Sequence, residues 1–290
     1  MKDYMYLAMA TEEGVRGYAA STTHLVEEAR LRHNTAPTAT VALGRALTAA
    51  ALMGGLLKVG QRVALKWEGN GPLGKIVVEA DSNGSLRGYT AAPEIDLPLV
   101  AGEQNIVGAI GQAGLLTVVR DLGLPELAEG TVALATSDIG GDLAYFLEQS
   151  DQVATAVEIG VTLNEDGSVA AAGGILIQPL PPYEAGVVER LKERLQEMPP
   201  VTALLAEGQK PEAILDETFR GLKHSMLAKY PVRFQCNCSL ERTREALASL
   251  GREELEAILA NEGEAVVTCQ YCHNEYVLSG EELEAMIAAL

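Results

Sequence analysis

All four cysteines of the 290-residue chain lie in its last fifth, as two close pairs, Cys236-Asn-Cys238 and Cys269-Gln-Tyr-Cys272. Because no thiol precedes Cys236, any sulfur chemistry is confined to one region of the chain. Two pairs separated by residues 239–268 offer four soft ligands, the number that a tetrahedral four-thiolate zinc site requires. The same pairs are equally able to close into two local disulfides, so the residues alone leave both alternatives open.

The length of the chain is sufficient for two domains with substantial cores. Hydrophobic residues make up 48% and charged residues 21%, which is ordinary for a globular protein. Aromatic residues make up only 4%, so we expect a core built mainly from Ala, Val, Leu and Ile.

The charge of the chain argues against a nucleic-acid partner. Its formal net charge is −18, and residues 232–290 carry four Arg and no Lys against eleven Glu. Sequence-independent binding to a phosphate backbone needs Lys and Arg to displace counterions. We therefore expect neither the whole chain nor its cysteine-containing end to bind nucleic acid.

Nothing in the sequence predicts a membrane segment. The first residues contain acidic side chains and no long apolar core, unlike a signal peptide. The longest apolar stretch, Ala46–Leu57, is too short to cross a bilayer and contains a Gly pair. We therefore expect a cytoplasmic protein, in a compartment where thiols stay reduced and a disulfide is usually transient, catalytic or sensory.

Residues 1–178 are predicted to form a core domain that mixes helices and sheet. Helices are expected at Thr23–His33, at Ala39–Lys58 after Pro37, and at 141–149, and the second is apolar enough on most sides to be buried between layers. After an N-terminal strand pair, strands are expected at 63–68, 75–80, 86–90, 115–120, 131–135, 154–163 and 168–178. Hairpin turns are expected at Asn83-Gly84 and Asn164–Gly167. This order is not that of a βαβαβ series.

Prolines at 179, 181 and 182 mark a boundary, after which residues 179–231 are predicted to be a helical linker. Helices are expected at Glu184–Glu197, after Pro200 and from Pro211. Residues 232–290 are predicted to be a small domain with helices near 239–250 and 253–261, a strand at 265–268 and a final helix. Ser279 and Glu282 form a capping box at the start of that helix. The expected fold class is α+β in three parts, 1–178, 179–231 and 232–290.

The string Gly69-Asn-Gly71-Pro-Leu-Gly74 matches the GxGxxG pattern but lacks its context. A dinucleotide site needs a helix next, whose N-terminus meets the pyrophosphate. Here Pro72 interrupts the string and the following residues resemble a strand. We expect a turn between strands and no nucleotide site.

The simplest interpretation of the cysteines is a structural zinc site, because a domain as short as 232–290 commonly needs a metal to offset its small core. A functional interpretation rests on the same contribution of the metal to the folding free energy. If metal binding supplies roughly 10–16 kcal/mol of the folding free energy, oxidation of the thiolates removes the ligands and unfolds the domain. Four thiolates leave no open position for a substrate, which argues against metal catalysis.

The chain as a whole resembles the thirty-three-kilodalton chaperonin family, the redox-regulated heat-shock chaperones of bacteria. The resemblance runs from about Arg32 to the C-terminus. In the core it rests on Arg32-His33, Ala42–Leu47, Glu68–Gly74, Arg87–Tyr89, Val118–Gly123, Ala144–Ser150 and Gly173–Gln178. Its most specific part is C-terminal: Phe234-Gln-Cys-Asn-Cys-Ser239, Arg242, Leu247, Leu250-Gly251, Val267-Thr-Cys-Gln-Tyr-Cys272 and Tyr276.

The resemblance implies an ATP-independent holdase, not an enzyme. It implies that Cys236, Cys238, Cys269 and Cys272 hold one Zn²⁺ in the reduced, inactive state. It further implies that oxidants form the disulfides Cys236–Cys238 and Cys269–Cys272, with loss of zinc and unfolding of the C-terminal domain. The active form would then bind unfolding client proteins and associate as a homodimer, whereas the reduced form would be a monomer.

Two other functions remain to be distinguished. A thiol–disulfide oxidoreductase would use the Cys269–Cys272 pair and needs an accessible cysteine of low pKa at the start of a helix. A constitutive zinc-ribbon module would bind its partner through a permanently metal-bound domain. Replacement of all four cysteines by Ser distinguishes the zinc-ribbon module from a redox switch. The module should lose binding of its partner, whereas the switch should lose autoinhibition.

Overall fold

The structure, a computed structural model, describes residues 2–290. The chain forms two compact units, Met1–Gln235 and Cys236–Leu290. Residues 179–235 lie within the first unit, and the further division of that unit at residue 178 stays a prediction. Both units combine helices with antiparallel strands, which confirms the α+β class.

The first unit contains a five-stranded sheet whose neighbouring strands are all antiparallel. Its order is β10 (His224–Pro231), β1 (Tyr4–Ala10), β2 (Val15–Ser21), β9 (Val169–Pro179) and β8 (Ala156–Leu163). The first and last strands of this order are the two edges of the sheet.

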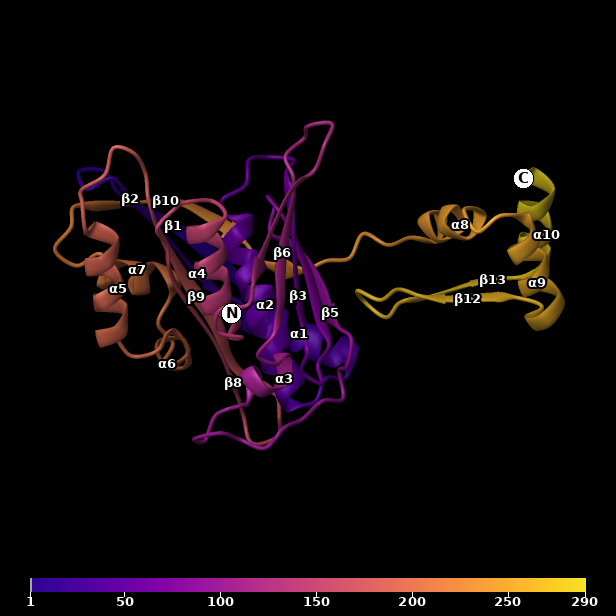
Figure 1. Ribbon diagram of the computed structural model, residues 1–290, viewed down its shortest axis with the longest axis horizontal. Coiled ribbons are helices and arrows are strands. Elements are labelled where there is room, and N and C mark those ends of the chain that lie inside the picture. Colours follow the sequence, from indigo (N-terminus) through magenta and orange to yellow (C-terminus); the bar gives the residue numbers. More distant parts are fainter. Residues whose placement is uncertain (1) are drawn as a thin grey trace. The chain divides into compact units, whose positions relative to one another are not determined.

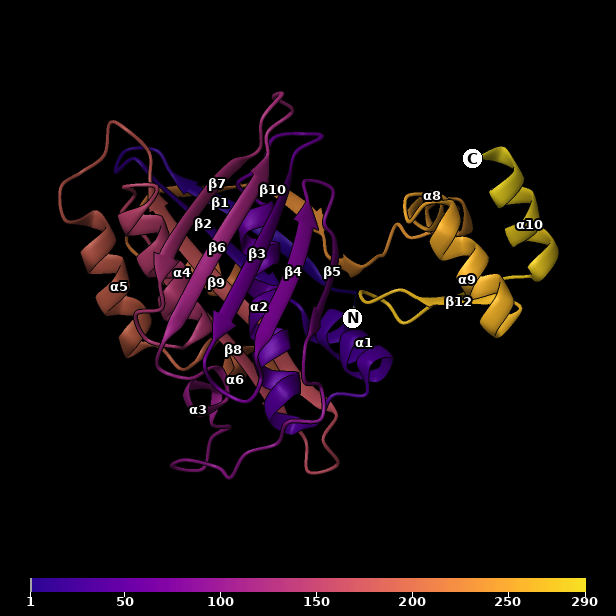
Figure 2. The same cartoon turned by 45° about the vertical axis from the view of Figure 1, so that its right-hand side comes forward.

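A six-stranded sheet faces it across a layer of helices (Figures 1 and 2). Its order is β11 (Arg233–Phe234), β5 (Ser85–Thr90), β4 (Lys75–Asp81), β3 (Arg62–Gly69), β6 (Gly114–Asp121) and β7 (Ala128–Ala133). Only β11 and β5 are parallel. This order confirms that the fold is not a βαβαβ series.

Both glycine-containing turns predicted in this sheet are present. Gly84 adopts a left-handed φ of 77° between β4 and β5, and the Asp81 carboxylate accepts the amides of Asn83 and Ser85. The GxGxxG string joins β3 to the antiparallel β4 and is followed directly by that strand, so the expected turn between strands is confirmed.

The layer between the sheets consists of α1 (Thr23–His33), α2 (Pro37–Gly54), α3 (Ile106–Ile110) and α4 (Ile139–Gln149). Helix α2 contacts strands of both sheets and buries every residue except Pro37 and Arg45. The predicted buried helix is thus confirmed, although it ends at Gly54 and not at Lys58. Its small residues let it pack closely: a Cβ on Gly44 would lie 2.5 Å from a methyl group of Val26 on α1.

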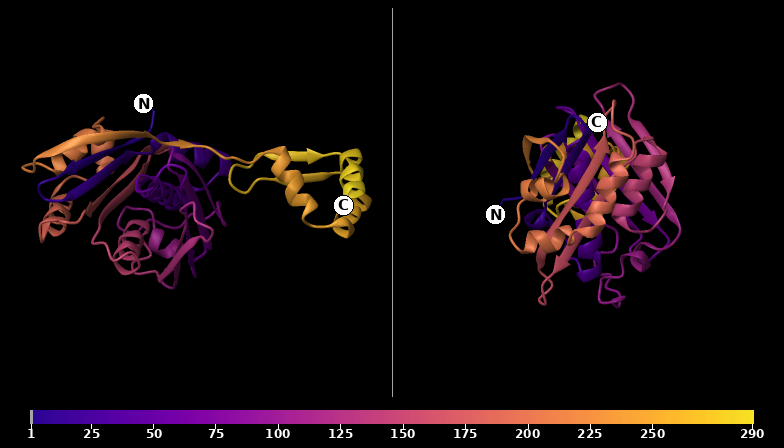
Figure 3. Two further views of the ribbon diagram at one scale, coloured as in Figure 1. Left: turned by 90° about the horizontal axis from the view of Figure 1, so that it is seen from above. Right: turned by 90° about the vertical axis from the view of Figure 1, so that its left-hand side faces the viewer.

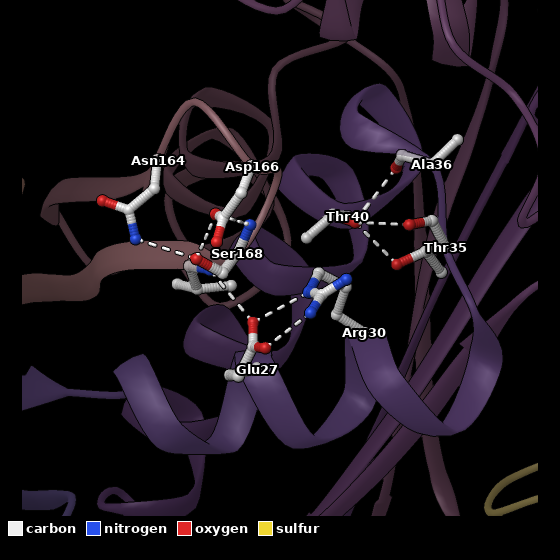
Figure 4. A network of polar contacts seen from close by, with 9 residues as sticks. Glu27, Arg30, Thr35, Ala36, Thr40, Asn164, Asp166 and Ser168 are labelled. Atoms are coloured by element: carbon white, nitrogen blue, oxygen red, sulfur yellow. Dashed lines mark hydrogen bonds and ion pairs between the residues drawn. The ribbon is translucent and has the colours of Figure 1, made fainter.

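Helix α1 is tied to the hairpin that joins β8 and β9 (Figure 4). The Glu27 carboxylate accepts two hydrogen bonds from the Arg30 guanidinium, at 2.8 and 2.6 Å, and one from the Val169 amide at 3.0 Å. In the hairpin, the Asp166 carboxylate accepts from the amide and hydroxyl of Ser168. The bond between Glu27 and Val169 fixes the start of β9 relative to α1.

A second helix layer, α5 (Val187–Glu197), α6 (Val201–Ala206) and α7 (Pro211–Thr218), covers the outer face of the five-stranded sheet (Figures 1 and 3). The apolar face predicted for the first of these helices is buried, with Val187, Val188 and Leu191 only 1%, 5% and 2% exposed. Phe219, just after α7, is fully buried in the same cluster. The three predicted helices are confirmed, but residues 224–231 form strand β10, which the sequence did not predict.

The second unit contains α8 (Leu240–Ala248), α9 (Arg252–Glu262), β12 (Ala265–Thr268), β13 (Glu275–Leu278) and α10 (Gly280–Ala289). The capping box of α10 is present, with the Ser279 and Glu282 side chains each accepting the backbone amide of the other residue. The buried core of this unit is small: Leu247, Leu255, Ala265, Leu278, Leu283 and Ile287. So few apolar side chains make a further stabilising element necessary.

Candidate metal centre

Two local elements of the second unit present the cysteines. Cys236 and Cys238 lie in the extended segment immediately before Ser239, whose side chain caps α8 by accepting the Arg242 amide at 3.3 Å. Cys269 and Cys272 lie in the turn between β12 and β13.

The turn between β12 and β13 is closed by its own backbone. The Cys269 amide donates to the Asn274 carbonyl at 2.9 Å, and the His273 amide donates to the Cys269 carbonyl at 2.8 Å. His273 has a left-handed φ of 57°, an uncommon conformation for a residue other than Gly. The tight turn keeps both of its cysteines on one side of the hairpin end.

The four sulfur atoms meet in one cluster. The Sγ atoms of Cys238 and Cys272 are 3.3 Å apart, those of Cys236 and Cys269 are 3.8 Å apart, and all four lie within 4.8 Å of one another. A regular tetrahedron with a centre-to-corner distance of about 2.3 Å, the Zn–S bond length, has edges of about 3.8 Å. The four-cysteine cluster can therefore hold a tetrahedral metal ion, and among residues 2–290 it is the one such group of His, Cys, Asp and Glu.

The surroundings of the sulfur atoms disfavour uncompensated thiolates. Cys272 is buried, with 4% exposure, and the other three cysteines are half-buried. Burial raises the pKa of the Cys269 and Cys272 thiols above the ordinary value. A bound divalent cation reverses this preference, because metal binding requires the deprotonated form.

Two side chains support the cluster from outside. The Tyr276 hydroxyl donates to the Cys238 Sγ across 3.1 Å, and this hydrogen bond raises the pKa of Tyr276 to about 12. The Arg242 guanidinium donates to the Asn237 carbonyl at 3.1 Å, which holds the segment between the first two cysteines. Cysteine spacing gave no signal for either contact, although both side chains belong to the motifs that carry the family resemblance.

The geometry does not decide which cysteines would pair on oxidation. No disulfide joins any of them in the structure. The sulfur atoms of Cys236 and Cys269 are 3.8 Å apart and those of Cys238 and Cys272 are 3.3 Å apart, so sulfurs of different motifs are close, whereas the resemblance implies pairing within each motif. All of these separations exceed the S–S bond length of about 2.0 Å, so any disulfide requires movement. The pairing Cys236–Cys238 and Cys269–Cys272 stays a prediction.

The arrangement of Cys269 and Cys272 disagrees with an oxidoreductase. Thiol–disulfide enzymes lower the pKa of an accessible cysteine at a helix N-terminus. Here the CxxC pair lies in a turn between strands, and burial raises both pKa values. The cluster has the character of a metal site.

Comparison with known proteins agrees with this geometry over the whole chain. The sequence model described as Hsp33 protein matches residues 3–279. A protein named 33 kDa chaperonin from Geobacter sulfurreducens is 49% identical over 98% of this chain and 94% of its own length. The chain belongs to the Hsp33 family. A second relative, the 33 kDa chaperonin of Bacillus pumilus, is 40% identical over 98% of both chains.

A solved structure of the Hsp33 family shares the fold. The 33 kDa chaperonin (heat shock protein 33 homolog) of Thermotoga maritima superposes with a TM-score of 0.91 at 36% identity, covering 99% of this chain and 98% of its own. Hsp33 proteins are redox-regulated chaperones that hold client proteins, and they are not enzymes. The four clustered cysteines are consistent with the redox switch of this family.

No helix within residues 2–290 combines the length and the apolar character that crossing a bilayer requires.

Proposed function

We propose that this Hsp33 protein works as a holdase that is inactive while Cys236, Cys238, Cys269 and Cys272 hold one Zn²⁺, and active once they are oxidised. The observation that carries the proposal is the four-sulfur cluster, in which all four sulfur atoms lie within 4.8 Å of one another, as a tetrahedral ion requires, in a unit with six buried core side chains. When bound, Zn²⁺ would keep the four sulfur atoms in the thiolate form and would cross-link the segment before α8 to the turn between β12 and β13.

Oxidation acts on the thiols as follows. Each pair of thiolates, Cys236 with Cys238 and Cys269 with Cys272, loses two electrons as its S–S bond forms. One molecule of hydrogen peroxide accepts the two electrons, takes two protons from the solvent and becomes two molecules of water. The four thiolates cease to be metal ligands. A disulfide between near neighbours closes only a very short loop and restores little stability. The unit thus loses a contribution of roughly 10–16 kcal/mol and unfolds.

Residues 179–231 are proposed to be the linker that carries this change to the first unit, with 1–178 as the core domain and 232–290 as the sensor. Their helices cover the sheet with a strongly apolar face, in which Leu191, Leu215 and Phe219 are 2%, 0% and 0% exposed. Once this cover detaches, apolar surface on both sides becomes available to unfolding clients. We propose that the active form is a homodimer and the reduced form a monomer, acting in the cytoplasm, where the thiols begin reduced.

The test is a single oxidation time course on the full-length, zinc-loaded protein. Zinc release is followed with a chromophoric chelator, and suppression of client aggregation is assayed at each time point. Both should rise together, and the oxidised protein should contain the two disulfides named above. Retention of zinc and of C-terminal helicity after full oxidation contradicts the proposal.

The matched control is the variant with all four cysteines replaced by Ser. It should protect clients without oxidant, because it lacks the ligands that keep the sensor folded. If the variant instead loses client binding, a constitutive zinc-ribbon module is the better description.

A further inference from the structure

Strand β8 is an open edge of the five-stranded sheet. It is the last strand in the sheet order and pairs only with β9. Alternate residues of an edge strand direct their N–H and C=O groups away from the sheet, where a further strand can pair with them. Within the described residues, the backbone hydrogen bonds that involve β8 join it to β9 alone.

The sequence of β8 lacks the usual protection of an edge. Natural edge strands carry Lys or Pro, which oppose pairing with another chain. The opposite edge of the sheet, β10, contains both Lys229 and Pro231. Strand β8, Ala156–Leu163, contains neither, and its one charged residue is Glu158.

A groove follows this edge along its length. Beside residues 155–158 it has a volume of about 460 Å³ and lies between α4, which provides Tyr145 and Glu148, and α5, which provides Lys192 and Leu195. Helices α4 and α5 contact β8 from opposite faces of the sheet, so the edge of β8 forms the floor of the groove between the two helices (Figure 1).

The groove continues beside residues 158–167, where its volume is about 900 Å³. Its walls there are α2 and the loop at 102–104 on one side and α6 on the other. Glu158 links the two parts and ties α6 to β8, because its carboxylate accepts the Val201 amide at 2.7 Å. An extended segment as long as β8 can therefore lie against the whole edge.

The charge of the groove indicates which kind of polypeptide segment would bind in it. Five acidic side chains line the two parts, and of the two basic ones, Arg45 is paired with Asp138. The five acidic residues are Glu103, Glu148, Glu158, Glu165 and Asp166. The apolar lining includes Leu99 and Tyr145, which are 57% and 38% exposed. Basic and apolar side chains on an extended backbone complement these surfaces.

We propose that the edge of β8 is a client-binding site, at which an extended segment of an unfolding protein, rich in basic and apolar residues, adds a sixth strand to the sheet. The inference deepens the proposed holdase function and rests on it. Because backbone pairing does not depend on side chains, the site can accept client segments of many sequences, as a chaperone for many clients requires. Helices α5 and α6 belong to the proposed linker, so their detachment on oxidation widens access to the edge.

The test uses the full-length oxidised protein and a soluble peptide of about ten residues that alternates Val with Lys and Arg, long enough to span the strand. A control peptide of the same sequence carries N-methyl groups on every second residue, which removes the N–H donors of one strand edge. We expect the control to bind at least tenfold more weakly, the effect of losing several backbone hydrogen bonds. Hydrogen exchange should show new protection of amides in residues 156–163 and none in 224–231. Equal binding of both peptides, or protection at β10, overturns the proposal.

A charge reversal in the groove provides a second test. Glu148→Lys should weaken binding of the basic peptide roughly fivefold. Glu126→Lys, the same change at another exposed residue outside the groove, should leave binding unchanged. Identical effects of the two changes contradict the proposal. If the oxidised wild-type protein fails to protect clients, the holdase proposal itself fails. If it protects clients but the peptide results are negative, only the β8 site is excluded.

Discussion

The hydroxyl group of Tyr276 donates a hydrogen bond to the sulfur atom of Cys238 across 3.1 Å. Tyr276 lies on β13 and Cys238 immediately precedes the cap of α8, so this contact joins the two halves of the cysteine cluster. A donor aimed at a thiolate sulfur withdraws electron density from it and reduces its reactivity toward oxidants. The contact thus links the fold of the hairpin to the sensitivity of the switch.

Tyr276→Phe is expected to accelerate oxidation, because the Cys238 sulfur loses its donor while the ring stays in place. The loss of this hydrogen bond should raise the rate of peroxide-induced zinc release by about fivefold or more. Stopped-flow measurement with a chromophoric chelator gives this rate. Tyr183→Phe, an exposed tyrosine of the first unit, is the control and should leave it unchanged. An unaltered rate in Tyr276→Phe means that the hydroxyl does not tune the thiol.

Sequence patterns predicted the elements whose signals are local. Helix α1 has the expected bounds, Thr23–His33, and the Ser279–Glu282 box fixes the start of α10 because both of its partners lie within one turn. Strand β10 was missed because its pairing partner, β1, lies at the opposite end of the first unit in sequence, and its own residues alternate only between half-buried and exposed. Strand β13 is four residues long and exists by pairing with β12.

The candidate site shows the same division between local and long-range information. The spacing of the cysteines predicted that all four come together, and the structure brings their sulfur atoms within 4.8 Å. The contacts of Tyr276 and Arg242 depend on where β13 and α8 pack, which spacing alone does not contain. The pairing of the disulfides also remains undecided, since the cluster places every sulfur atom close to the others.

Removal of the metal from the reduced protein is expected to unfold the second unit selectively. The unit buries six core side chains, too few to replace a metal contribution of roughly 10–16 kcal/mol. Hydrogen exchange after treatment with a strong chelator should show loss of protection in α8, α9 and α10, while α2 stays protected. Re-addition of Zn²⁺ under reducing conditions is the control and should restore protection. Persistent protection of α8–α10 without metal contradicts a metal-dependent fold.

Phe219→Ala is expected to loosen the helices that cover the five-stranded sheet. Its ring is fully buried in the cluster formed with α5, α7 and the sheet, and such a truncation costs about 3–5 kcal/mol. The reduced variant should therefore show faster amide exchange in α7 and partial suppression of client aggregation without oxidant. Leu124→Ala, at a side chain that is 64% exposed, is the control and should change neither quantity. Faster exchange with no gain in client protection excludes a masking role for these helices.

The stability of the protein in acid should depend on Glu27. Its hydrogen bonds with Arg30 lower the pKa of the Glu27 carboxyl below 4.5, despite a smaller opposing effect of burial. A carboxyl with a lowered pKa in the folded state stabilises the fold above its unfolded pKa, and this contribution is lost as the pH falls through the folded value. Glu27→Gln should therefore lower the urea midpoint by the equivalent of about 1 kcal/mol or less at neutral pH, and the difference from wild type should vanish in acid. Glu28→Gln, at an exposed pair with Arg32, is the matched control and should have the smaller effect. A difference that is constant down to pH 3, roughly one unit below the ordinary carboxyl pKa, contradicts this role.

His224 is expected to give the opposite pH dependence at the start of β10. Burial of the ring opposes its charge, but hydrogen bonds to the Asp216 carboxylate at 2.8 Å and to the Leu222 carbonyl at 3.0 Å outweigh it and raise the pKa of His224 above 6.5. A base with a raised pKa in the folded state contributes stability that is fully present below its unfolded pKa, and this stability is lost as the pH rises through the folded value. Asp216→Asn keeps a hydrogen-bond acceptor but removes the negative charge. At pH 6, where most of the imidazole is protonated, it should therefore lower the urea midpoint by the equivalent of about 1 kcal/mol or less. Near pH 9 it should have little effect on the urea midpoint. Glu217→Gln, on the same helix but paired with Arg220, is the control and should show no such dependence. Parallel profiles of Asp216→Asn and wild type across this range mean that the Asp216–His224 pair, which joins α7 to β10, does not make the stability of the protein depend on pH.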